Sequence, residues 1–134
     1  MKKSILVFTA FILTGCASIT DAPKNIVGFS TRDMEAARSQ ATTADFQADF
    51  TGVFDTVLDV AKDNNYYVFS QDEIRGLIVL MNIPGFVDTT EVGVFISSLK
   101  GGAFRVEISS RSSPTKEAVA KAVLGKLEEK FKKI

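Results

Sequence analysis

The sequence predicts an α+β fold, an antiparallel sheet of four to five strands with two helices packed on one face. Apolar residues recur with helical spacing in two segments, around residues 51–63 and 113–131. Four short segments rich in β-branched and aromatic residues lie between them, separated by turn residues. A fifth, alternating segment precedes the first helix. The expected order of elements is therefore β-α-β-β-β-β-α.

The first strand is expected over residues 44–50, where apolar and polar side chains alternate. A period of two is typical of a strand with one face in water. The polar positions include Asp45 and Asp49, and acidic side chains suit a strand at the edge of a sheet. A helix beginning at residue 46 is the alternative interpretation.

Both helices have recognisable ends and apolar stripes. Thr51 is the expected N-cap of the first helix and Asn64-Asn65 its stop, because asparagine tolerates the left-handed conformation. Ser113 is expected to cap the second helix and Pro114 to open it. The stripes comprise Val53, Phe54, Val57, Leu58 and Ala61 in the first helix, and Val119, Ala120, Val123, Leu124, Leu127 and Phe131 in the second.

The four later strands are expected at residues 66–70, 77–83, 89–99 and 103–111. The segment 77–83 is almost continuously apolar, as in a central strand covered on both faces. The last two strands form a hairpin, and pairing Leu99 with Ala103 leaves a three-residue loop that contains two glycines. This register puts Val94 opposite Ile108. It also gathers on one face Val92, Val94, Ile96, Phe104, Val106 and Ile108.

Phe95 and Leu99 fall on the other face of that hairpin, together with one set of central-strand side chains, Ile78 and Leu80 or their neighbours. Two helices on one side of a sheet cannot cover both faces. We therefore expect Phe95 and Leu99 to belong to a surface for a partner or for self-association. Burial under the N-terminal segment or under Phe86 is the alternative.

The N-terminus has the parts of a secretory signal: Lys2 and Lys3, then an apolar run over residues 5–13. It ends in Leu13-Thr14-Gly15-Cys16, and Cys16 is the only cysteine of the chain. The segment resembles bacterial lipoprotein signals, which implies cleavage after residue 15 and a diacylglycerol thioether on Cys16. Ala17 and Ser18 follow, which implies sorting to the outer membrane in a diderm bacterium. A small buried residue or a free thiol is the alternative role for Cys16.

The expected organisation is a signal peptide at 1–15, a flexible tether at 16–42 and one domain at 43–134. The tether is small and polar in composition. Within it, residues 31–40 could form a short helix, with Ser30 as its cap and Asp33 and Glu35 in its first turn.

Composition argues against several classes of function. The full chain has 16 basic and 16 acidic residues, and loss of Lys2 and Lys3 leaves a slight acidic excess, which does not suit nucleic acid. The chain has no histidine, so the commonest general base and transition-metal ligand are missing, and with Cys16 modified no thiol remains as a nucleophile. We expect that the protein is not an enzyme and that it binds no metal and no cofactor. The acidic, serine and lysine clusters are expected to be ordinary surface or capping residues: Asp55, Asp59 and Asp63; Asp72 and Glu73; Ser109, Ser110, Ser112 and Ser113; Lys126, Lys130, Lys132 and Lys133.

Three segments carry a family resemblance: Asp55 to Lys62 with Asn64-Asn65-Tyr66 shortly after, Arg75-Gly76-Leu77-Ile78, and Asp88 to Phe95 with Val106 to Ser110. In this order they resemble small, largely uncharacterised bacterial lipoproteins. The layout is also similar to the helix-grip-like modules of the C component of the outer-membrane β-barrel assembly machinery. The resemblance implies a fold and a location but no catalytic residues.

The function expected from these observations is that of a non-enzymatic, membrane-tethered binding or structural module. The module would be held by lipid on Cys16 at the periplasmic side of the outer membrane, and it would bind an envelope protein or itself. The alternative is a binder of a small lipid or cell-wall fragment in a groove between helices and sheet. A pocket lined by both layers would favour that alternative.

Overall fold

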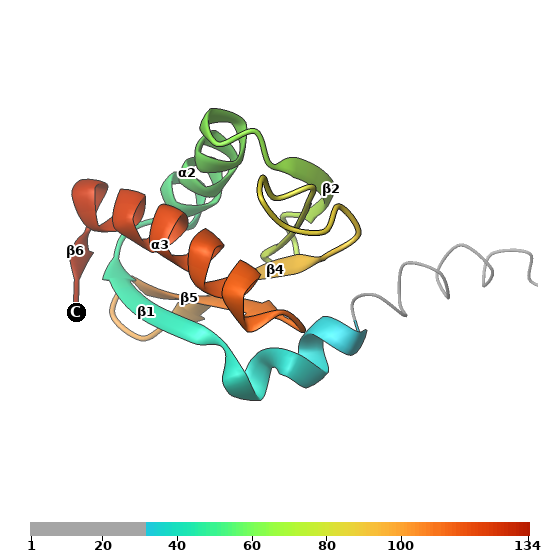
Figure 1. Ribbon diagram of the computed structural model, residues 1–134. Coiled ribbons are helices and arrows are strands. Elements are labelled where there is room, and N and C mark those ends of the chain that lie inside the picture. The colour runs from blue at the N-terminus through green and yellow to red at the C-terminus, as the bar shows by residue number, and fades with distance from the viewer. Residues whose placement is uncertain (1–31) are drawn as a thin grey trace, which may run out of the picture.

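The computed structural model describes residues 32–134, which build one six-stranded antiparallel sheet (Figure 1). The strands lie in the order β2-β3-β4-β5-β1-β6. Helices α2 (Phe50–Asp63) and α3 (Ser113–Lys130) lie together on one face of this sheet. The α+β class is thus confirmed. The strands are β1 (Thr42–Gln47), β2 (Tyr67–Asp72), β3 (Leu77–Met81), β4 (Val92–Leu99), β5 (Ala103–Ser110) and β6 (Lys132–Lys133).

The first strand and helix meet a little earlier in the chain than the sequence predicts. β1 ends at Gln47, and its residues pair with β5, so the alternative of a helix from residue 46 is wrong. The N-cap of α2 is Asp49 and not Thr51, because the Asp49 carboxylate accepts a hydrogen bond of 2.8 Å from the Gly52 amide. The helix ends as expected, with Asn65 in the left-handed region at a φ of 57°.

The main core fills the space between the two helices and the sheet. It contains Phe46 from β1, Phe54 from α2 and Leu80 from β3, none more than 2% exposed. The inward face of the hairpin and the stripes of both helices complete it as predicted. Fully buried members include Val53, Val57, Ile78, Val92, Val94, Val106, Ile108, Val119, Val123 and Leu127.

The predicted hairpin register is confirmed: Leu99 pairs with Ala103, and Val94 with Ile108. Both loop glycines, Gly101 and Gly102, have positive φ values of 77° and 71°. β3 is also central as predicted, between β2 and β4, and Leu77 to Leu80 are all buried.

The C-terminus corrects two expectations. Ser112, and not Ser113, caps α3 by accepting a hydrogen bond from the Thr115 amide. After α3 the chain runs back along β1 as β6, which makes the sheet one strand wider than predicted. The Ile134 amide donates to the Asp45 carbonyl at 3.0 Å. β1 is therefore an edge strand over only part of its length.

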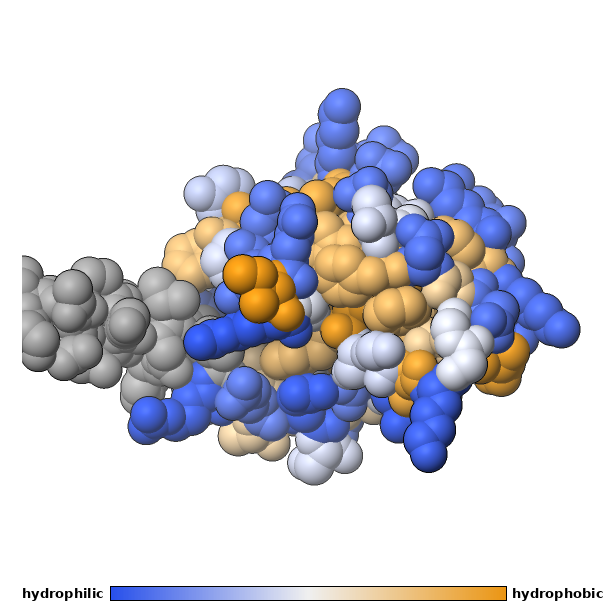
Figure 2. Space-filling view, turned by 180° about the vertical axis from the view of Figure 1, so that it is seen from behind, coloured by the Kyte–Doolittle hydropathy of each residue, from blue (hydrophilic) through white to orange (hydrophobic). Residues whose placement is uncertain are grey.

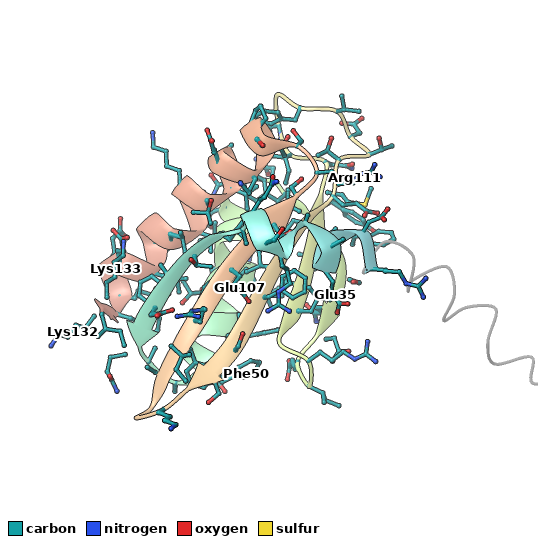
Figure 3. All side chains as sticks on the ribbon, turned by 90° about the horizontal axis from the view of Figure 1, so that it is seen from below. Glu35, Phe50, Glu107, Arg111, Lys132 and Lys133 are labelled. Atoms are coloured by element: carbon teal, nitrogen blue, oxygen red, sulfur yellow. The ribbon has the colours of Figure 1, made fainter. Side chains whose placement is uncertain are left out.

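Residues 32–40 correct the predicted tether. Residues 32–36 are helical and continue into the 3-10 turn η1 (Ala37–Gln40). We call residues 32–40 the strap. It lies across the face of the sheet opposite to α2 and α3 (Figures 1 and 3), and its Met34 is only 2% exposed. The short helix predicted here is thus present, but it packs on the sheet, so the folded unit includes residues assigned to the tether. Its predicted cap, Ser30, and the signal residues lie outside the described residues.

A bidentate ion pair ties β1 to β5 on the strap side of the sheet. The Arg105 guanidinium donates to the two Asp45 carboxylate oxygens at 2.8 and 2.9 Å. This hydrogen bond, more than the charge of Arg105 alone, lowers the pKa of Asp45 below its ordinary value of 3.8.

We expect this pair to make stability pH-dependent on the acid side. Because the folded-state pKa of Asp45 is depressed, its contribution is present above 3.8 and is lost as pH falls through the lower folded value. Thermal unfolding followed from about pH 5 to about pH 2 should show that acid lowers the stability of Arg105→Gln less than that of the wild type. Arg75→Gln, which removes an equal charge from a turn, should behave like the wild type. Parallel curves for Arg105→Gln and wild type would contradict the expectation.

Candidate functional site

A second, smaller apolar cluster lies on the sheet face that α2 and α3 leave open. It consists of Met34 from the strap, Leu77 and Val79 from β3, and Phe95 from β4. Leu77 and Phe95 are direct neighbours across the β3–β4 ladder. All four side chains are at most 7% exposed. One residue of the strap therefore completes the burial of three residues of the sheet.

Gly93 makes room for the Met34 side chain. A Cβ atom at Gly93 would lie 2.6 Å from the Met34 sulfur and 2.9 Å from Cε2 of Phe95. Both separations are closer than real Cβ contacts, so any side chain here would displace the methionine or the aromatic ring. A glycine within β4 weakens the strand itself. At this position it leaves the hollow in which the strap is seated.

Arg38 fastens the strap one helical turn further along. Its guanidinium forms an ion pair with the Glu107 carboxylate of β5 and lies 4.3 Å from the centre of the Phe95 ring. Figure 3 places Glu107 on the sheet face beneath the strap. A cation above an aromatic face is attracted by the ring quadrupole. The same arginine thus covers Phe95 and neutralises Glu107.

Three further contacts hold the rest of the strap. The Ser109 hydroxyl donates a buried hydrogen bond of 2.9 Å to the Met34 carbonyl. Arg111 pairs with Asp33 at 3.4 Å, and the Lys116 ammonium donates to the Gln40 carbonyl at 2.6 Å. We call the sheet residues that receive the strap the docking face: Leu77, Val79, Gly93, Phe95, Glu107 and Ser109.

The predicted partner surface is covered in the described chain, and its role in binding a partner stays a prediction. Phe95 is only 6% exposed, because the N-terminal segment covers it, as in the alternative interpretation. Phe86, the other proposed cover, instead packs against the main core. Leu99 is half-buried and lies at the hairpin end of the same strand. From the central strand, Leu77 and Val79 join Phe95, whereas Ile78 and Leu80 face the helices.

A cavity of about 310 Å³ opens beside the strap. Its walls come from the start of the strap (Asp33, Met34), the loop before β4 (Thr89 to Glu91) and the chain after β5 (Arg111, Ser112). The ion pair of Asp33 and Arg111 stands in its wall, and Arg111 is 80% exposed. The cavity therefore belongs to the strap region and not to the space between helices and sheet.

Several of the candidate serine and lysine side chains make structural contacts. Ser110 donates to the Glu91 carbonyl and Ser112 caps α3. Of the basic C-terminal residues, Lys126, Lys130 and Lys133 pair with Glu129, Asp59 and Glu128. Across residues 32–134 no group of three or more acidic, histidine or cysteine side chains is placed to hold a metal ion.

Sequence reasoning missed Met34, Arg38 and Gly93 as a set. The strap has little apolar content, and its partners on the docking face are roughly 40 to 75 residues away in the chain. One signal was present: an isolated glycine inside an apolar strand marks a bulge or a close approach by another group. Gly93 is such a position.

Residues 13–16, which carry the predicted lipidation site Cys16, lie outside the described residues. Among the helices of the described part, none is both long and apolar enough for a membrane crossing. No protein-family model matches the sequence, and no curated protein matches it. The resemblance to bacterial lipoproteins therefore stays an expectation drawn from the sequence.

Proposed function

We propose that this protein is a cell-envelope lipoprotein that acts as a non-enzymatic, membrane-tethered binding or structural module. The signal ending in Leu13-Thr14-Gly15-Cys16 supports the lipid anchor. Ala17 and Ser18 after the cysteine support an outer-membrane location facing the periplasm. Its partner would be an envelope protein or another copy of the chain.

The docked strap is the structural observation that supports a tethered module. The segment that leads from Cys16 to the domain ends in a strap docked by an apolar side chain, an ion pair and a buried hydrogen bond. Between Cys16 and the strap lie residues 17–31, which span at most about 55 Å in any conformation. Docking the strap would thus hold the domain close to the bilayer with a defined face toward its tether.

The alternative, a small lipid or cell-wall fragment between helices and sheet, has less support. Phe46, Phe54 and Leu80 fill that space and are almost completely buried. A ligand of lipid size would need these side chains to move. The filled core favours a module that uses its outer surfaces.

Lipidation of Cys16 can be tested by metabolic labelling with a clickable fatty acid. The wild-type chain should be labelled and should sediment with membranes, because two or more acyl chains give stable anchoring at about 0.8 kcal/mol per buried CH₂. Cys16→Ala should lose the label, whereas the neighbouring change Ser18→Ala should keep it. Equal labelling of Cys16→Ala and wild type would overturn the proposal.

A further inference from the structure

We propose that the docking face accepts the strap of a second copy of this chain, so that two copies side by side exchange residues 32–40. This inference deepens the self-association part of the proposed function and rests on it for the membrane setting. The residues that recognise the partner are those that hold the strap within one chain.

The docking face recognises a pair of side chains one helical turn apart. The hollow over Gly93 takes a flexible apolar side chain, which Met34 fills between Leu77, Val79 and Phe95. Four residues later, the Phe95 ring and the Glu107 carboxylate take an arginine, here Arg38. Every copy of the chain carries a segment with this pair at the right spacing.

The strap can open without unfolding the domain. Of its residues only Met34 is buried, and the other side chains are half-buried or exposed. The main core lies on the opposite face of the sheet and contains no strap residue. A segment with few buried apolar contacts belongs to the low-stability part of a structure and opens locally.

The connection to the domain also permits exchange. Ala41 alone joins the strap to β1, in an extended conformation with φ −65° and ψ 148°. A change at this one residue would swing the strap outward while β1 stays paired with β5. The same hydrogen bonds, ion pairs and apolar contacts would then form between two chains as form within one.

Local concentration decides between the two arrangements. Since the contacts are the same in both, the exchanged form gains when copies are concentrated against one another. Lipid anchors on Cys16 would confine the chains to one membrane surface, within the reach of residues 17–31. Exchange is therefore expected between anchored neighbours and to be weaker in dilute solution.

The test is a cross-link that only two chains can make. Two variants of the mature chain are prepared, one with Arg38→Cys and the other with Glu107→Cys. They are reconstituted together in phosphatidylethanolamine–phosphatidylglycerol vesicles and treated with a short bismaleimide. The lipid-modified Cys16 has no free thiol. A 38–107 cross-link between chains, identified by mass spectrometry, should exceed by about ten-fold the yield from the matched pair of Arg75→Cys and Glu107→Cys. Arg75 is an arginine outside the strap, and its side chain is 75% exposed.

The chain that carries both Arg38→Cys and Glu107→Cys reports docking itself, through a cross-link within one molecule. The exchange would be overturned if this internal cross-link forms while the yield of the cross-link between chains does not exceed that of the Arg75→Cys control pair. The absence of both cross-links in cooperatively melting variants would overturn it as well.

A solution arm, in which both chains also carry Cys16→Ala, separates the exchange from the anchor. There the product should rise with protein concentration. Equal yields in dilute solution and on vesicles would contradict the part played by the anchor, while the exchange itself would stand.

Discussion

Gly76→Ala is expected to lower the free energy of unfolding by at least about 3 kcal/mol. Gly76 ends the turn before β3 at a φ of +64°, a region that L residues occupy at a cost. An added Cβ would lie 2.2 Å from the Ile96 carbonyl oxygen, which is backbone of the neighbouring strand. The Gly76 carbonyl also accepts a hydrogen bond of 2.7 Å from the Ile96 amide. Relief of the clash would therefore pull apart β3 and β4 where they meet the turn.

Gly101→Ala is the matched control for this experiment. Gly101 has a similar φ of +77°, but its Cβ would meet no atom within 4 Å. The free energy of unfolding of this variant should fall only by the cost of the left-handed conformation, about 1–2 kcal/mol. Urea denaturation of both variants separates conformational strain from the backbone clash. Equal losses in the two variants would contradict the close approach of Gly76 to β4.

Phe95→Ala is expected to destabilise the isolated chain by about 3–5 kcal/mol, the range for truncating a buried aromatic residue. The ring is 6% exposed and packs with Met34, Leu77 and Val79. Arg38 lies over its face and would lose that contact. Truncation therefore empties the centre of the docking face and weakens the hold on the strap.

Two measurements make this result specific. Denaturation gives the loss of stability, and amide hydrogen exchange should accelerate in residues 32–40 more than in the main core. Leu99→Ala is the control on the same face of β4, and it should cost less because Leu99 is half-buried. A small stability loss for Phe95→Ala, with unchanged exchange in the strap, would contradict the docked arrangement.

Local pattern in the sequence is enough for most of the secondary structure. Alternation and the glycine loop define the register of the β4–β5 hairpin, because a shift by one residue would set Ile96 against Glu107 and mix the two faces. The helix stripes and the apolar run of β3 were equally readable. The caps were less certain, since Asp49 and Thr51, like Ser112 and Ser113, are both suitable residues close together.

The sequence by itself determined the α+β class, the order of the five main strands and two helices along the chain, and the side chains of the hairpin and the helices that face the main core. Those features depend on periodicity within short segments. Only the tertiary structure decided that β1 lies beside β5, that Lys132–Lys133 adds a sixth strand, and that the strap covers Phe95. These depend on contacts between distant parts of the chain. The strap brings one buried methionine and one arginine to a hollow that a glycine far along the chain leaves open. Contacts of this kind between distant residues leave no periodic pattern in the sequence.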